Sequence, residues 1–75
     1  MPTLRDLREA ALLSQQELAA MLQVSRQTVS DWEHAHARPR PVYRRKLVEI
    51  YKKEPEEIIA AIKATAEEEK ERAAA

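Results

Sequence analysis

Apolar residues recur at spacings of three and four along most of the chain and fall into five short segments. The first runs from about Leu4 to Leu12, and the second carries Leu18, Ala19 and Leu22 on one face. This spacing is typical of amphipathic helices, and no segment alternates between apolar and polar residues as a strand would. The pattern predicts an all-α protein, a compact bundle of about five helices that forms one domain over residues 1–75.

Side chains that cap helix N-termini mark where the first three helices begin. Thr3, Ser14 and Ser25 each stand directly before a helical segment and can accept hydrogen bonds from its first amides. Glu17 stands three residues after Ser14, which is the spacing of a capping box. The second and third helices are therefore expected over about residues 15–22 and 26–34.

Two prolines close together break the helical pattern in the middle of the chain. Pro39 and Pro41 stop the third helix, because proline lacks an amide hydrogen, and Pro41 suits the first turn of the next one. A fourth helix is expected over about residues 42–52 and a fifth over about residues 55–72, with a polar end that frays into solvent. The residues expected to be buried on these two helices are Leu47, Ile50, Tyr51, Ile58, Ile59 and Ile62.

The charges are unevenly distributed, although they sum to zero over the whole chain. Residues 1–53 carry a net charge of +4, and residues 54–75 carry a net charge of −4. The stretch from Arg26 to Lys53 is the most basic, with eight positive residues against three acidic ones. A basic face beside an acidic end is typical of a domain that binds nucleic acid.

Several classes of function find no support in the residues. The chain has no cysteine for a disulfide or a Cys-based zinc site, and His34 and His36 are two residues apart, so they do not face each other. There is no glycine-rich phosphate loop and no catalytic arrangement, and the chain is too short for a substrate cavity. Nothing resembles a signal peptide or a membrane span. We therefore expect no enzyme, metal, cofactor, small-molecule substrate or membrane partner, and a cytoplasmic location.

The two middle helices are separated by a tight link, Gln23-Val24-Ser25. This spacing lets the helix at 15–22 brace the helix at 26–34 while the latter projects outward. A projecting helix fits the major groove of B-DNA and brings its first residues to base edges. The predicted partner is therefore double-stranded DNA.

The segments Leu18-Ala19 and Val24 to Glu33, followed by Pro39, resemble the Cro and phage-repressor helix-turn-helix family, and the likeness extends from about Leu4 to Ile58. The resemblance implies that Gln15 grips a phosphate and that Arg8 pairs with Glu33. It also implies that the first residues of the recognition helix read bases. The base-reading candidates are Arg26, Gln27, Ser30 and Asp31.

Hydrogen-bonding chemistry agrees with these assignments. An arginine can donate two bonds to guanine and a glutamine can pair with adenine, whereas Asp31 could accept from cytosine, orient Arg26 or repel wrong sequences. Trp32 is spaced from Val29 as a core residue, although base stacking is the alternative. The candidates for contacts to the DNA backbone are Gln15, Gln16, Ser25, Thr28, His36, Arg38, Arg40, Tyr43 and Arg44.

The chain departs from this family at its turns. Members usually have glycine in the turn and after the recognition helix, whereas this chain has Gln23 and Ala35 and no glycine anywhere. A residue at positive φ without glycine costs about 1 kcal/mol. The absent glycine, the regular caps and the Ala/Glu/Lys-rich end favour a computationally designed or redesigned member, with a thermophilic source as the alternative.

Two other functions are compatible with the same helices. The domain could be a protein-interaction module of the antitoxin or adaptor kind, or a designed scaffold without a ligand. An adaptor should have apolar residues on the outer face of the third helix, where this chain has Arg26, Gln27, Ser30 and Asp31. A monomer in solution is favoured if Ile58, Ile59 and Ile62 all pack inward, and two copies on DNA stay open.

Overall fold

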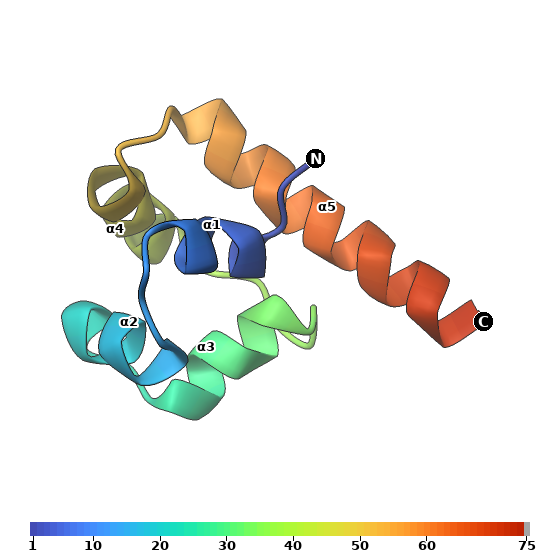
Figure 1. The fold of residues 1–75 in the computed structure, drawn as a ribbon, viewed down its shortest axis with the longest axis horizontal. Helices are drawn as coiled ribbons and strands as arrows, with labels where there is room; N and C mark the ends of the chain where they lie inside the picture. Colours follow the sequence, from blue (N-terminus) through green and yellow to red (C-terminus); the bar gives the residue numbers. More distant parts are fainter. Residues whose placement is uncertain (75) are drawn as a thin grey trace.

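The computed structural model describes residues 1–74, which form five helices and no strand (Figure 1). In Figure 1, α1 lies at the centre of the view, with α2 and α3 on one side and α4 and α5 on the other. The predicted all-α bundle is confirmed, and its radius of gyration is 11.5 Å. The helices are α1 (Leu4–Ala10), α2 (Gln15–Leu22), α3 (Arg26–Glu33), α4 (Pro41–Tyr51) and α5 (Pro55–Ala74).

The predicted caps are confirmed at the starts of α1, α2 and α3. The Ser14 hydroxyl accepts the Glu17 amide at 3.0 Å, and the Glu17 carboxylate accepts the Ser14 amide at 2.9 Å. Thr3 forms the same reciprocal pair with Asp6, at 3.2 and 2.9 Å, and Ser25 accepts the third amide of α3. These bonds satisfy amides that a helix start leaves free, so the N-termini follow from local sequence.

Several helix ends differ from the prediction. Helix α1 ends at Ala10 rather than near Leu12, because Leu12 adopts a left-handed φ of 60° and is 89% exposed. Helix α3 ends at Glu33, and α4 spans Pro41–Tyr51, one residue earlier at both ends than expected.

The polar end of α5 is helical over residues 67–74, which extends the helix slightly beyond the expected end near residue 72. Arg72 pairs with Glu68 at 2.8 Å and with Glu69 at 3.1 Å, one turn back along the helix. Such pairs at spacings of four and three support an exposed helix. Ala75 lies outside the described residues.

Within residues 1–74 of this glycine-free chain, four residues adopt the left-handed conformation. They stand after α1, α2, α3 and α4, and they are Leu12, Gln23, Ala35 and Lys52, with φ between 53° and 60°. Left-handed backbone crowds the Cβ atom and costs about 1 kcal/mol at each position. Each helix-ending turn therefore has the geometry that glycine usually provides, without glycine.

The core lies where α1, α2, α3, α4 and α5 meet. Trp32 is 5% exposed, which confirms its core role, and Val29 beside it is fully enclosed. The buried apolar residues are Leu4, Leu7, Leu18, Ala19, Leu22, Val29, Trp32, Leu47, Ile58, Ala61 and Ile62.

Three residues expected in the core are not fully buried. Ile59 is 54% exposed and lines an open groove between α4 and α5, whereas Ile58 and Ile62 are buried. Ile50 and Tyr51 are half-buried at the edge of the core, and burial raises the pKa of the Tyr51 phenol. The expectation that all three isoleucines of α5 pack inward is therefore wrong at Ile59.

Helix α5 is tied to the start of α1 by a buried polar contact. The Thr65 hydroxyl accepts the Leu4 amide at 3.0 Å and donates to the Ala61 carbonyl at 2.7 Å. This buried hydroxyl both donates and accepts a hydrogen bond, which offsets the cost of its burial and fixes α5 against α1.

Within residues 1–74, no helix combines the length and the apolar character needed to cross a bilayer.

Candidate nucleic-acid interface

Helices α2 and α3 are joined by the turn Gln23-Val24-Ser25, as expected. Gln23 has φ 59° and ψ 43°, so the turn keeps the conformation in which the family usually has glycine. The Val24 amide donates to the Ala19 carbonyl at 3.0 Å and closes the end of α2. Ser25 then starts α3 in a new direction, so α2 braces α3 from behind.

Helix α3 has an inner and an outer face of different character. Val29, Trp32 and Glu33 are buried on the inner face. The outer face is entirely polar: Arg26 and Gln27 are exposed, and Ser30 and Asp31 are partly exposed. The fold thus brings the four base-reading candidates to one surface.

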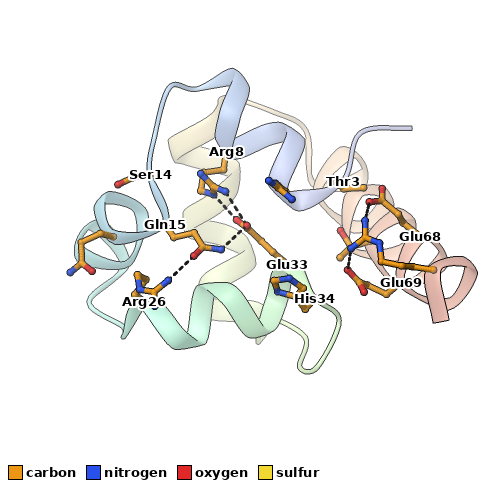
Figure 2. Close-up of a pocket in the computed structure, with 13 residues that line it drawn as sticks. Thr3, Arg8, Ser14, Gln15, Arg26, Glu33, His34, Glu68 and Glu69 are labelled. Atoms are coloured by element: carbon orange, nitrogen blue, oxygen red, sulfur yellow. Dashed lines mark hydrogen bonds and ion pairs between the residues drawn. The ribbon is translucent and has the colours of Figure 1, made fainter.

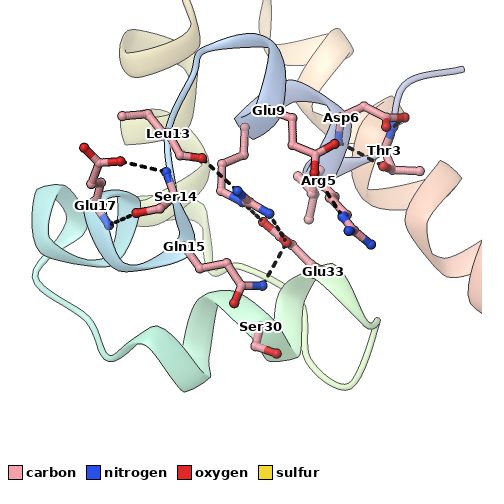
Figure 3. Close-up of polar contacts among 12 residues, drawn as sticks. Thr3, Arg5, Asp6, Glu9, Leu13, Ser14, Gln15, Glu17, Ser30 and Glu33 are labelled. Carbon is pink, nitrogen blue, oxygen red and sulfur yellow. Dashed lines mark hydrogen bonds and ion pairs between the residues drawn. The ribbon is translucent and has the colours of Figure 1, made fainter.

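The expected pairing of Arg8 with Glu33 is confirmed (Figure 2), and Figure 3 labels Glu33, Leu13 and Gln15 around the same contact. Arg8 donates from Nε to Glu33 Oε2 at 2.7 Å and from Nη2 to Oε1 at 3.1 Å, and its Nη1 donates to the Leu13 carbonyl at 2.7 Å. Both side chains are nearly enclosed. The hydrogen bonds with Glu33 raise the pKa of Arg8, because they favour the charged guanidinium.

The ion pair continues outward through Gln15, a link that the sequence did not predict. Gln15 Nε2 donates to Glu33 Oε1 at 3.0 Å, and Arg26 Nη1 donates to Gln15 Oε1 at 3.1 Å (Figure 2). These residues line a surface cavity of about 580 Å³ between α1, α3 and the end of α5. Periodicity could not have revealed this chain, because it joins side chains of three helices.

Asp31 contacts Gln27 rather than Arg26. Gln27 Nε2 donates to Asp31 Oδ1 at 3.0 Å, and His36 Nδ1 lies 3.8 Å from the same oxygen. If Asp31 orients a neighbouring side chain, that neighbour is Gln27 and not Arg26 as the sequence analysis considered. His34 Nδ1 lies 2.9 Å from the Ser30 carbonyl, at the end of the same helix.

The backbone-contact candidates fall into an exposed and a more enclosed group. Tyr43 is half-buried with its ring 5.5 Å from that of Trp32, and Arg44 is half-buried with a buried Nε that has no hydrogen-bond partner within residues 1–74. Arg44 lines a cavity with Ile59 and Lys63, between α4 and α5. The exposed candidates are Gln16, Ser25, His36, Arg38 and Arg40, while Gln15 and Thr28 are partly exposed.

A comparison with known protein families finds a match over residues 4–58 to the family described as helix-turn-helix. The chain belongs to this helix-turn-helix family. The match spans α1 to the start of α5 and confirms the resemblance to Cro and the phage repressors. The family is one of DNA-binding domains, not enzymes.

Beyond the family match, no curated protein and no solved structure shows significant similarity to the chain. Within residues 1–74, no cluster of three or more histidine, aspartate or glutamate side chains could hold a metal ion.

Proposed function

We propose that this protein recognises a specific sequence in double-stranded DNA with α3 in the major groove. Arg26 and Gln27 would contact base edges, and Ser30 and Asp31 would act one turn further along. The observation that carries the proposal is the polar outer face of α3, which stands on a firmly packed inner face. An arginine at a helix N-terminus opposes the helix dipole, so a guanine contact gives it a function there.

The DNA backbone would be held on both sides of α3. The first amides of α2 and the side chains of its start can receive one phosphate, because a helix N-terminus attracts anions. The basic loop before α4 and the start of that helix would hold another. The proposed backbone contacts are Gln15, Gln16, Ser25, Thr28, His36, Arg38, Arg40, Tyr43 and Arg44.

The competing assignment is a protein-interaction module or a scaffold without a ligand. The outer face of α3 favours DNA binding over protein interaction, because Val29 is the one apolar residue between Arg26 and Asp31 and it is buried. The exposed Ile59 lies on α5, away from this face. The exposure of Ile59 removes the argument for a monomer that assumed its burial. We still propose a monomer in solution, because one exposed isoleucine offers far less surface than the roughly 800 Å² per partner of a stable dimer, and Ile59 is the residue through which two copies could meet on DNA.

Selection from a randomised duplex pool, followed by titrations at two salt concentrations, tests the proposal. We expect one enriched site, and Arg26→Ala should cost about 1–3 kcal/mol on it and relax the preference at one base pair. Weak binding without any enriched sequence, or an unchanged preference in the Arg26 variant, would contradict base recognition by α3. Sedimentation of the free protein gives the oligomeric state.

A further inference from the structure

Both histidines of the chain lie together at the end of α3. His34 is the C-cap of this helix, and the left-handed turn at Ala35 brings His36 back beside it, so the two rings stack with their centroids 5.9 Å apart. Helical spacing alone would place these side chains on different faces, and the turn is the reason for the difference. Because both residues are exposed, the fold presents them as one pair that a ligand can reach.

The hydrogen-bond partner of His34 determines where this ring can gain a proton. Its Nδ1 lies 2.9 Å from the Ser30 carbonyl, which can only accept a hydrogen bond. Nδ1 therefore carries the hydrogen of the neutral ring, and a second proton binds at Nε2. In the charged ring Nε2 becomes a second donor, and the C-terminal end of a helix favours the added positive charge.

His36 stands beside the carboxylate on the outer face of α3. Its Nδ1 lies 3.8 Å from Asp31 Oδ1, which also accepts a hydrogen bond from Gln27 at 3.0 Å. The backbone holds this arrangement, because the His36 amide donates to the Asp31 carbonyl at 2.8 Å. A charged His36 would therefore offset the negative charge that Asp31 otherwise presents to a DNA backbone.

The other charged groups near this pair are carboxylates and guanidinium groups. His34 borders the cavity of Figure 2 together with Gln15 and Gln16, which are proposed to hold a phosphate. The charged residues that line this cavity are Arg5 and Arg8 of α1, Arg26 and Glu33 of α3, and Glu68, Glu69 and Arg72 of α5. Side chains of these types ordinarily keep their charge between about pH 5.5 and pH 7.5, whereas imidazole gains a proton there. Acidification in this range therefore adds positive charge to the proposed interface at the two histidines.

We propose that His34 and His36 make DNA binding dependent on protons, so that the protein binds DNA more tightly as the solution becomes more acidic. The inference rests on the proposed function and adds a regulation of the same site, because it needs a DNA backbone beside the end of α3. Phosphates favour the charged form of a nearby imidazole, and by linkage the bound protons favour the complex to the same extent.

Binding titrations at about pH 5.5 and about pH 7.5, over the same salt series, test this dependence. On acidification, the affinity of the wild type should rise about three- to tenfold, and the slope of log affinity against log salt should steepen by about one unit for each histidine that contacts a phosphate. His34→Gln and His36→Gln should each lose part of the rise. The double variant contains no histidine, so its affinity should be nearly independent of pH and close to that of the wild type at the higher pH.

The outcomes distinguish this inference from the proposed function. A double variant that keeps the rise of the wild type, or a wild type whose affinity does not rise in acid, would overturn the proton dependence and leave base recognition by α3 intact. The same rise is expected on a duplex without the enriched site, because phosphates are common to all sequences. Binding without any sequence preference would overturn the proposed function, and this second duplex would still test the histidines. A protein that binds neither duplex would overturn both.

Calorimetry gives an independent count of the protons. DNA is titrated into the protein near pH 6.5 in two buffers with different heats of ionisation, which yields the number of protons taken up per complex. The wild type should take up protons, to a maximum of about two, and the double variant should take up none. Because both histidines are exposed, the variants should keep the fold, and circular dichroism at both pH values checks this. Equal uptake by the two proteins would assign the protons to other groups, such as the Met1 amine, and overturn the role of the histidines.

Discussion

Arg8 of α1 and Glu33 of α3 lie 25 residues apart in the chain and meet in a bidentate ion pair at 2.7 and 3.1 Å. Arg8 also donates to the carbonyl of Leu13, in the link between α1 and α2. One buried guanidinium therefore joins three segments around the helix-turn-helix. Because each charge is withdrawn from water, each depends on the other for its stability.

Loss of one partner of this pair should be strongly destabilising. Arg8→Met leaves Glu33 buried without its counter-charge, and we expect the free energy of unfolding to fall by about 3–5 kcal/mol. The double variant Arg8→Met/Glu33→Leu should recover most of this loss, since no unpaired charge remains. Urea denaturation of the three proteins measures the effect. A double variant as unstable as the single one would mean that the pair contributes more than mutual neutralisation.

Trp32→Ala should destabilise the fold by about 3–5 kcal/mol, because the ring is 5% exposed and its removal leaves a cavity. A domain of this kind has about 5–15 kcal/mol in total, so the variant can lose its fold. Ile59→Ala is the matched control, since this isoleucine is 54% exposed and should cost less than about 1 kcal/mol. Thermal unfolding followed by circular dichroism compares them. A Trp32 variant that melts normally but loses DNA affinity would show that the ring contacts DNA and does not stabilise the core.

Gln23→Gly should stabilise the protein by about 1 kcal/mol or be neutral, because glycine removes the crowding at φ 59° while giving the unfolded chain more freedom. Ala20→Gly in the interior of α2 is the control and should destabilise by about 1 kcal/mol, since no strain is relieved there. Denaturant unfolding separates the two substitutions by sign. A clear loss of stability in Gln23→Gly would show that the side chain makes a favourable contact in the turn.

Arg40→Ala should weaken binding to all DNA sequences about equally and reduce the slope of log affinity against log salt by about one unit. Arg40 is exposed in the basic loop before α4. Arg44→Ala should have the same effect on DNA and should also lower stability, because Arg44 packs between α4 and α5. Binding titrations over a salt series, together with unfolding curves, measure both effects. A loss that depends on the base sequence would exclude a pure backbone contact.

The capping box of α2 should give the stability a pH dependence. The Glu17 carboxylate accepts the Ser14 amide, and this bond lowers its pKa from 4.5. A group whose pKa is lowered by folding stabilises the protein above its unfolded-state pKa, and this contribution is lost as the pH falls through the folded-state value. Glu17→Gln keeps a cap that does not titrate.

Urea unfolding at neutral pH and at about pH 3 should therefore show a smaller loss of stability in Glu17→Gln than in the wild type. The two proteins are identical at every other residue, so the difference isolates Glu17. An equal loss in the two proteins would show that the capping bond is unimportant for the acid sensitivity.

The amino-acid sequence alone determined where the first three helices begin. Caps such as Ser14 and Ser25 act on amides a few residues away, so their effect can be recognised without knowledge of the rest of the fold. The polar outer face of α3 follows equally directly from helical spacing. The Arg8–Glu33 pair was predictable only through the family resemblance, because nothing local relates residues so far apart.

Tertiary structure alone decided the remaining features. Ile58 and Ile59 are adjacent and chemically identical, and only the packing of α5 against α1 and α4 determines that the first is buried and the second exposed. The chain from Glu33 through Gln15 to Arg26 needs three side chains from two helices at hydrogen-bonding distance. Hydrogen bonds depend on distances of a few tenths of an ångström, and those distances exist only once the helices are packed.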